Sequence, residues 1–195
     1  MAASTSLRAG PIGEIVALGQ SVWFDNIRRG LLTSGEFERM VREDGLSGVT
    51  SNPSIFEKAI VASTDYDEAL TEARAGARDG EVPDPKSVYE GLAIGDLCQA
   101  ADVLRPGYEE TDAGDGYVSM EVAPDLAHDT AGTVAEARRL WAAVDRPNLM
   151  IKVPGTEEGI PAVRQLIAEG INVNITLLFS VLVYERVVDA YLAGL

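Results

Sequence analysis

Lys152 has the clearest potential for chemistry in this sequence, because it lies inside the apolar run 149–153, just before Pro154-Gly155. Lysine is rarely buried without a reason, and loss of hydration favours a neutral amine over an ammonium. Bringing a lysine pKa to near neutrality takes roughly 3 units, about 4 kcal/mol. A neutral amine is a nucleophile that condenses with a ketone to form a Schiff base. The alternative is a lysine at a strand end whose stem lies on apolar surface while its ammonium reaches water.

The elements that must position Lys152 alternate between short strands and amphipathic helices. Strands are predicted over residues 21–26, 48–54, 117–122, 149–153 and 172–178. Apolar residues at helical spacing predict one helix after a capping box over 33–36 and two more over 55–60 and about 65–78. Four further helices are predicted to begin at Asp84-Pro85, Thr130, Thr156 and Ser180. Residues 105–116 are expected to form a loop. This alternation predicts a parallel sheet, either doubly wound or closed as a barrel.

Side-chain parity favours the barrel. Residues two apart in a strand share a face, and one face of the five strands is nearly all apolar, as a face covered by helices should be. The opposite face is polar and consists of Trp23, Asp25, Thr50, Asn52, Ser119, Glu121, Met150, Lys152, Asn172, Asn174 and Thr176. A doubly wound sheet buries both faces under helices, whereas the interior top of a barrel holds an active site. A polar layer that is only structurally satisfied is the alternative.

Composition and charge limit the partners. The chain has 195 residues and a net charge of -15, which argues against nucleic acid and anionic membranes. No apolar run approaches the roughly 20 residues that span a bilayer, and residues 1–11 contain no hydrophobic signal core. A single cysteine, Cys98, excludes an internal disulfide and favours a cytoplasmic location. We expect an N-terminal extension over 1–20 and one domain over 21–195.

Four segments of the sequence resemble transaldolase. Gly48-Val-Thr-Ser-Asn-Pro-Ser-Ile-Phe56 and Ile151-Lys-Val-Pro-Gly-Thr-Glu-Glu-Gly-Ile160 are similar to the two signature segments of that family. The segments Trp23–Asp25 and Asn172–Ser180 resemble two further segments of the same enzyme. The resemblance implies a (β/α)8 TIM barrel of the class I, Schiff-base-forming aldolase superfamily. It also implies a pentose phosphate pathway transferase that moves a dihydroxyacetone unit from sedoheptulose 7-phosphate to glyceraldehyde 3-phosphate.

The resemblance also implies a role for each matching residue. Lys152 corresponds to the Schiff-base nucleophile, and Asp25 to the general acid/base at the donor C4 hydroxyl. Glu121 corresponds to the carboxylate that assists dehydration through a water held with Thr176. The substrate-binding positions are Asn52, Asn174 and Thr50. The expected substrates are phosphorylated keto and aldo sugars, and neither a metal nor an organic cofactor is required.

The sequence departs from this family in length. Only about five β/α units are present, whereas a closed barrel has eight, so we expect a truncated chain that lacks the phosphate-binding side chains of later strands. Open strand edges predict that the chain completes its sheet with another copy, with a missing second half, or not at all. The missing phosphate-binding side chains predict low turnover of phosphorylated donors through weak binding. A fructose 6-phosphate aldolase-like enzyme is one alternative. Glu121 disfavours it, because the short aldolases of that kind resemble each other in carrying glutamine at this position. A catalytically silent half-barrel with an oligomerising role is the other.

Four further residues are expected to take no part in the chemistry. Cys98 lies in an apolar helical stretch and is expected in the core, and His128 is expected in a loop without a partner. Arg28 and Arg29 follow Asp25 and are placed to attract a substrate phosphate, but their expected role is that of solvated surface charges.

Overall fold

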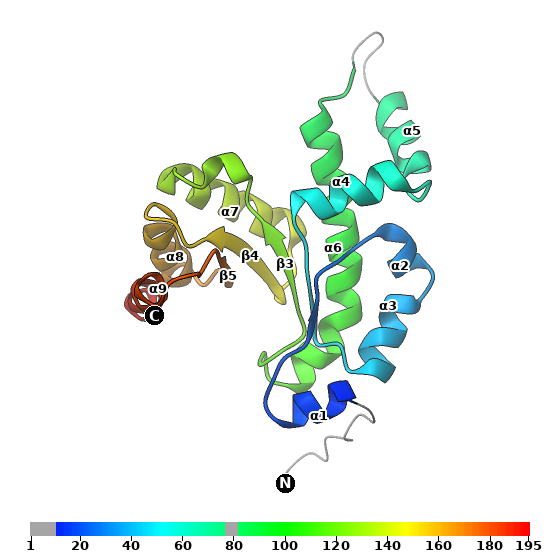
Figure 1. Cartoon of the computed structure of the whole chain (residues 1–195). Helices are drawn as coiled ribbons and strands as arrows, with labels where there is room; N and C mark the ends of the chain where they lie inside the picture. Colours follow the sequence, from blue (N-terminus) through cyan, green and yellow to red (C-terminus); the bar gives the residue numbers. More distant parts are fainter. Residues whose placement is uncertain (1–10, 77–81) are drawn as a thin grey trace. The chain divides into compact units, whose positions relative to one another are not determined.

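The computed structural model describes residues 11–76 and 82–195, and it has the predicted α/β fold (Figure 1). The strands are β1 (Trp23–Phe24), β2 (Gly48–Thr50), β3 (Tyr117–Glu121), β4 (Leu149–Pro154) and β5 (Val173–Thr176). They form one sheet in sequential order, and the pairs β1–β2 and β4–β5 are parallel. All five predicted strands are therefore present, each shorter than predicted or equal to it within a residue.

Helices separate the strands, as the hydrophobic periodicity predicts. They are α1 (Pro11–Ala17), α2 (Arg29–Thr33), α3 (Glu36–Arg39), a π-helix (Met40–Asp44), α4 (Pro53–Ala62), α5 (Asp67–Ala75), α6 (Pro85–Glu110), a 3-10 helix (Pro124–Leu126), α7 (Thr130–Val144), α8 (Gly159–Ala168) and α9 (Val181–Gly194). The predicted end of α5 near Arg78 falls outside the described residues. Among the helices described, none combines the length and apolarity needed to cross a membrane.

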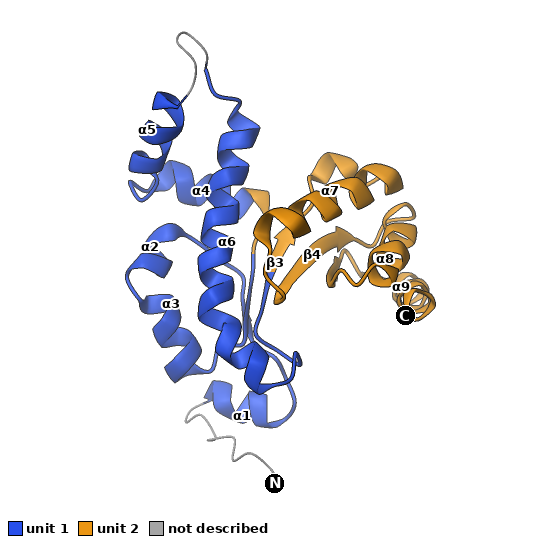
Figure 2. Cartoon of the chain, turned by 180° about the vertical axis from the view of Figure 1, so that it is seen from behind, with its two compact units in different colours: residues 1–50, 54–118 blue, residues 51–53, 119–195 orange. Residues whose placement is uncertain are grey.

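The chain divides into two compact units, coloured separately in Figure 2. The first contains the described residues up to Thr50 and those from Ser54 to Val118. The second contains Ser51–Pro53 and Ser119–Leu195. The boundary passes through β3, so this strand contributes residues to both units.

Several helix starts follow directly from local side-chain chemistry. The Asp84 carboxylate accepts a hydrogen bond from the Ser87 amide at 2.9 Å, and the Ser180 hydroxyl accepts one from Val183 at 3.4 Å. These bonds satisfy amides that have no partner within the helix, and they confirm the predicted starts. Thr156 likewise accepts from the Gly159 amide at 2.9 Å, but regular α8 geometry begins only at Gly159.

Two local predictions were wrong, and tertiary packing or turn geometry explains each. Residues 105–110 are helical rather than a loop, because α6 continues through Pro106. The Tyr108 ring packs edge-on against Tyr117, with ring centroids 5.3 Å apart, which offsets the hydrogen bond that proline removes. The predicted capping box also fails, because Thr33 ends α2 and Gly35, at φ +77°, separates it from α3.

The second unit is built around the apolar face of β4. Leu149, Ile151 and Val153 are fully buried, while Met150 and Lys152 between them are partly exposed. Helices α7 and α8 both pack on β4 and carry buried apolar residues of their own. The alternation along β4 thus sends its apolar side chains toward these helices and leaves Lys152 on the opposite face.

A buried polar cluster holds the first unit together beside β1. The Asp96 carboxylate is fully buried, receives a hydrogen bond from the Tyr66 hydroxyl at 2.8 Å, and pairs with Arg29 Nε at 2.9 Å. Burial raises the pKa of Asp96, although its bonds with Tyr66 and Arg29 act in the opposite direction. The Arg29 guanidinium also stacks on the Tyr66 ring, 4.7 Å from its centroid. Arg29 is therefore a structural ion-pair residue, which corrects its expected role as a solvated charge.

This cluster predicts a large stability loss for Asp96→Ala. The change leaves Arg29 and the Tyr66 hydroxyl without their acceptor, so the free energy of unfolding should fall by about 2 to 3 kcal/mol. We expect urea denaturation to measure this loss. Asp189→Ala, which changes an exposed carboxylate, is the matched control and should stay within about 0.5 kcal/mol of the unmodified chain. Equal stability of the two variants would contradict a structural role for the cluster.

Candidate active site

Lys152 lies on the partly exposed face of β4, with its side chain 13% exposed. Its Nζ is 3.7 Å from the nearer carboxylate oxygen of Glu121, whose side chain is 22% exposed. The same ammonium donates a long hydrogen bond of 3.4 Å to the carbonyl oxygen of Ser51. Lys152 and Glu121 therefore face the same side of the sheet, as side-chain parity predicted, and a proton can pass between them with little movement.

Asn174 is the neighbour of Lys152 on the next strand. The parallel register of β4 and β5 pairs these two residues, so their side chains share a face. The Asn174 amide donates to the Ser119 hydroxyl at 3.0 Å, and Ser119 is buried. Thr176 lies two residues further along β5, opposite Pro154 in the register. Asn174 is thus held at a defined position beside the lysine.

Ser51 is a positioning residue that the sequence did not reveal. Its hydroxyl donates to the Ser119 carbonyl at 2.9 Å, and its amide donates to the same oxygen at 3.3 Å. These two bonds fix the backbone that presents the Ser51 carbonyl to Lys152. The Ser51 side chain is buried, but its contact with the lysine is made by its backbone, which no side-chain pattern reveals.

The turn after β4 depends on glycine. A Cβ on Gly159 would collide with the Pro154 carbonyl, and one on Gly155 would lie 2.9 Å from the Thr176 carbonyl. The Gly155 amide donates to that Thr176 oxygen at 2.8 Å. Close backbone approach of this kind is available only to glycine. The segment that follows Lys152 is therefore locked to the end of β5.

The predicted site residues are divided between the two units. The second unit contains Lys152, Glu121, Asn174, Thr176 and Asn52. The first unit contains Asp25, which is exposed directly after β1, and Thr50 at the end of β2. The Thr50 hydroxyl is buried and has no hydrogen-bond partner among the residues that the structure describes. The lysine–carboxylate pair is thus formed within a single unit.

Two residues that were assigned no chemistry differ from expectation. His128 is exposed but has a partner, because its Nδ1 lies 3.1 Å from a carboxylate oxygen of Glu158. This hydrogen bond holds the pKa of Glu158 below its usual value. Cys98 lies on α6 as expected but is only half-buried. Neither residue is in the second unit's lysine cluster.

Comparison with known proteins identifies the family. A family model described as Transaldolase/Fructose-6-phosphate aldolase matches residues 22–194. The chain belongs to the transaldolase/fructose-6-phosphate aldolase family. It is 52% identical to the transaldolase of Thiobacillus denitrificans over 182 residues, which cover 93% of this chain and 49% of that protein. It is 53% identical to transaldolase 2 of Nostoc punctiforme, over 93% of this chain and 46% of that protein.

Membership in the transaldolase/fructose-6-phosphate aldolase family confirms the resemblance and the fold class inferred from the sequence. The five-stranded sheet and the helices between its strands are part of the TIM-barrel fold of these aldolases. The chain spans about half the length of the curated relatives it matches, including the transaldolase of Acidothermus cellulolyticus, of which it covers 48% at 47% identity. The family description includes two activities and does not itself choose between them.

The geometry predicts that Lys152→Met leaves the fold intact. Among residues 11–76 and 82–195, the ammonium has a long bond to Ser51 and a 3.7 Å contact with Glu121, whose side chain is 22% exposed. We therefore expect a loss of about 1 kcal/mol or less in the free energy of unfolding, well below that of Asp96→Ala. Urea denaturation followed by circular dichroism measures it. A loss above about 3 kcal/mol would mean that Lys152 is primarily a structural ion-pair residue.

Proposed function

We propose that this chain carries the Schiff-base chemistry of a transaldolase of the pentose phosphate pathway. The substrates would be sedoheptulose 7-phosphate as donor and glyceraldehyde 3-phosphate as acceptor of a dihydroxyacetone unit. The observation that supports this function best is the half-buried Lys152 amine, 3.7 Å from the Glu121 carboxylate. Relatives of about half identity that are named transaldolase support the same assignment.

The proposed reaction begins at Lys152. Its neutral amine attacks the keto carbon of the donor and forms a carbinolamine, which loses water to give an iminium ion. Glu121, whose carboxylate lies 3.7 Å from the amine, moves the protons for this dehydration through a water held with Thr176. Because the ammonium form is not a nucleophile, Glu121 is also the group placed to take its proton.

Cleavage of the carbon–carbon bond needs a second acid/base. Asp25 would remove the proton of the C4 hydroxyl while the iminium accepts the electron pair of the breaking C3–C4 bond. The aldose leaves, and the remaining enamine adds to the acceptor aldehyde. Asn174, Asn52 and Thr50 would hold donor hydroxyls. The fixed bond of Asn174 to Ser119 supports such a role, because it orients the amide before substrate arrives.

Other properties are inferred with this function. We infer a partial barrel domain over residues 21–195 after an extension over 1–20, and a cytoplasmic location consistent with a single cysteine. The net charge of -15 supports small-molecule substrates rather than nucleic acid or membrane partners. The proposed chemistry uses side chains alone and assigns no role to a metal or an organic cofactor.

Trapping of the imine tests the proposed function. Dihydroxyacetone and sodium borohydride should produce a stable adduct on Lys152, because reduction converts the iminium to a secondary amine. The chain contains three lysines, Lys58, Lys86 and Lys152, so peptide mass spectrometry assigns the adduct without ambiguity. Glu121→Gln should slow the adduct about a hundredfold, as expected for loss of a general acid/base.

The controls of this experiment separate the competing functions. Lys152→Met should give no adduct, and equal labelling of Lys58 and Lys86 would indicate unspecific reaction. An absent adduct on Lys152 would favour a catalytically silent half-barrel. If the adduct forms, donor cleavage measured with and without erythrose 4-phosphate distinguishes a transaldolase, which needs the acceptor, from a fructose 6-phosphate aldolase.

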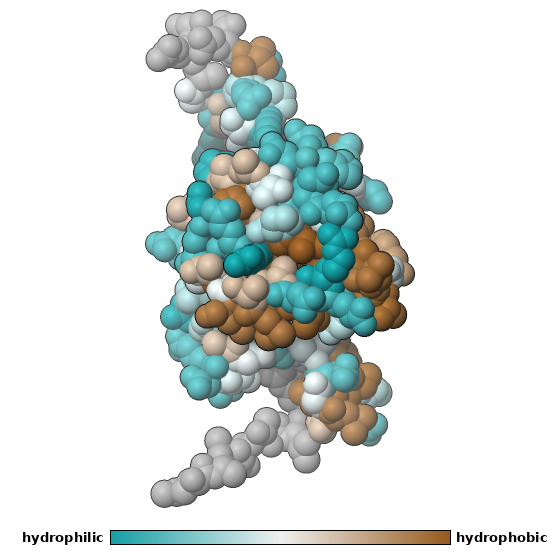
Figure 3. Space-filling model, turned by 90° about the vertical axis from the view of Figure 1, so that its left-hand side faces the viewer, coloured by the Kyte–Doolittle hydropathy of each residue, from teal (hydrophilic) through white to brown (hydrophobic). Residues whose placement is uncertain are grey.

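We further propose that copies of this chain self-associate through the apolar surface around α9. Phe179 is 90% exposed, and Leu182 and Leu195 are 66% and 80% exposed. On the side seen in Figure 3, hydrophobic surface lies uncovered between hydrophilic areas. Contiguous exposed apolar residues of this kind are typical of interaction surfaces. The β5 edge next to α9 supports the same inference, because an unpaired strand edge favours association.

Leu182→Glu is expected to weaken this association. A carboxylate on the proposed contact surface must lose its hydration when two copies meet, which is unfavourable. Sedimentation velocity should therefore show a concentration-dependent oligomer for the unmodified chain and a shift toward monomer for the variant. Val61→Glu is the matched control, because Val61 is 81% exposed on α4 in the other unit. A monomeric unmodified chain would contradict the proposal.

A further inference from the structure

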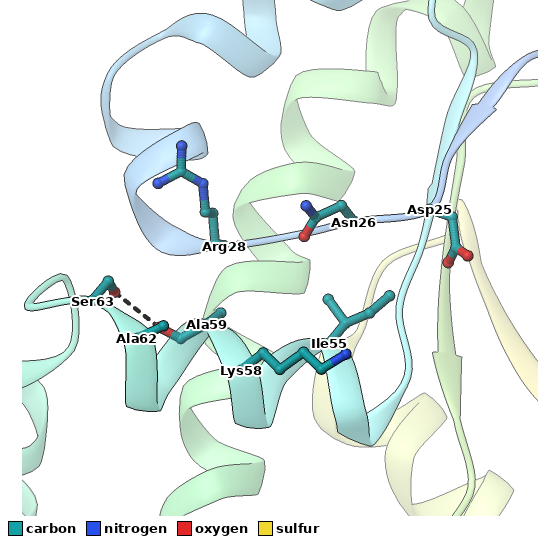
Figure 4. A pocket seen from close by; sticks show the side chains of 8 residues that line it. All are labelled: Asp25, Asn26, Arg28, Ile55, Lys58, Ala59, Ala62 and Ser63. Atoms are coloured by element: carbon teal, nitrogen blue, oxygen red, sulfur yellow. Dashed lines mark hydrogen bonds between the residues drawn. The ribbon is translucent and has the colours of Figure 1, made fainter.

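The first unit contains a cavity that has the features of a second ligand site. It has a volume of about 410 Å³, and polar side chains from the loop after β1 and from α4 line it (Figure 4). The loop contributes Asp25, Asn26 and Arg28, and the helix contributes Lys58. Pockets of about 300 to 1,000 Å³ hold small-molecule ligands. This cavity is therefore large enough for a phosphate group together with a short sugar.

The charged side chains of this cavity form no ion pair with the part of the chain that the structure describes. Within residues 11–76 and 82–195, no side-chain hydrogen bond or ion pair involves Asp25, Arg28 or Lys58. The chain holds 31 acidic and 16 basic residues, so a cation readily finds a carboxylate. Most described arginines do so, and examples are the pairs Arg39–Asp44, Arg105–Glu109, Arg138–Glu169 and Arg186–Glu157. Arg28 and Lys58 have no such carboxylate partner among the described residues, so two positive charges that are not ion-paired line one cavity.

The wall that carries Arg28 is rigidly anchored. Ile27 before it is fully buried, and Arg29 after it is held by Asp96 at 2.9 Å. The Arg29 amide donates to the Tyr66 hydroxyl at 3.0 Å, and the Gly30 amide donates to Asp65 at 3.1 Å. A backbone fixed on both sides of Arg28 keeps the base of its side chain at the cavity wall, from which the guanidinium can rotate inward. This anchoring reduces the entropy lost when a ligand is bound.

The opposite wall is anchored by Phe56, which is buried and packs edge-on against Tyr89, with ring centroids 6.1 Å apart. Figure 4 shows Lys58 extending along α4 toward Ile55, while the Arg28 guanidinium is turned away from it. Because Arg28 is exposed, rotating its side chain toward the cavity breaks no side-chain hydrogen bond or ion pair with any residue that the structure describes. Asp25 lies at the far side of the labelled group from Arg28, so an anion near Arg28 is separated from this carboxylate.

We propose that Arg28 and Lys58 form an anion subsite that binds the phosphate group of a small sugar phosphate. A phosphate dianion matches a planar arginine fork together with a lysine ammonium, and the amide of Asn26 supplies a further donor. A local pair of cations is needed because the net charge of -15 repels anions in general. The subsite stands on its own geometry. Only the identity of the sugar rests on the proposed function, since Asp25 lines the same cavity.

Acylation of the three lysines tests the subsite directly. The full chain is treated with limiting acetic anhydride in inorganic phosphate or in sodium chloride of equal ionic strength, and peptide mass spectrometry measures modification at each lysine. Bound phosphate should slow the acylation of Lys58 at least threefold and leave Lys86 unchanged. Equal ionic strength matters because salt screens exposed charges in any case. Equal protection of Lys58 and Lys86, or none, overturns the proposal.

Variants of Arg28 show whether the protection depends on the proposed pair. Arg28→Gln should abolish the effect of phosphate on Lys58, whereas Arg28→Lys should retain most of it because it keeps the charge. Arg74→Gln, which removes an exposed cation outside the cavity, is the matched control and should leave protection intact. Protection that persists in Arg28→Gln overturns the proposal, provided that circular dichroism shows a folded chain. If Arg28→Gln does not fold, the comparison of Arg28→Lys with Arg74→Gln decides. Loss of phosphate protection at Lys58 in both of these variants overturns the proposed pair.

This test is independent of the Schiff-base test. Dihydroxyacetone carries no phosphate, so borohydride trapping reports on Lys152 alone. Phosphate protection reports on Lys58 alone. A trapped adduct without protection would reject only the anion subsite, and protection without an adduct would reject only the proposed function.

Discussion

The alternation of side chains along β4 is the constraint on which the site depends. Leu149, Ile151 and Val153 are buried against α7 and α8. Because successive side chains of a strand point to opposite faces, one residue cannot change face unless its neighbours do so as well. Lys152 is therefore held on the other face by the burial of three apolar side chains, whose removal from water contributes about 1.5 to 3 kcal/mol each. The position of the amine is thus set by hydrophobic packing rather than by its own weak polar contacts.

The buried polar groups around this lysine form hydrogen bonds with one another, so the amine stays accessible. The buried Ser51 and Ser119 bond to each other, and Ser119 then accepts from Asn174. These bonds remove the cost of burying the groups concerned. The contacts of Lys152 with Ser51 and Glu121, by contrast, are long, at 3.4 and 3.7 Å. The residues that support the site are thus fixed by short hydrogen bonds, whereas the amine proposed to react has weak contacts and is free to attack a substrate.

The sequence was most informative where structure is determined by neighbours along the chain. The face of Lys152, the cap at Asp84 and the cap at Ser180 follow from periodicity and from side chains two or three residues away. It was least informative where distant residues decide. The helix beyond Pro106 depends on Tyr117, and the ion pair of Arg29 depends on Asp96, which is 67 residues away. Neither contact has a local signal. Ser51 acts through its carbonyl, a group that every residue carries.

Helix α9 shows that one packing partner does not account for its composition. Val187 and Ala190 are buried in a cluster with Ile160, which covers one side of the helix. Leu182, Tyr184 and Leu192 remain exposed on the same helix. A helix with one apolar stripe needs one neighbour, whereas apolar residues on several sides are typical of a helix that is enclosed. The sequence of α9 therefore favours a second contact surface in addition to α8, which is the surface proposed above for association between copies of this chain.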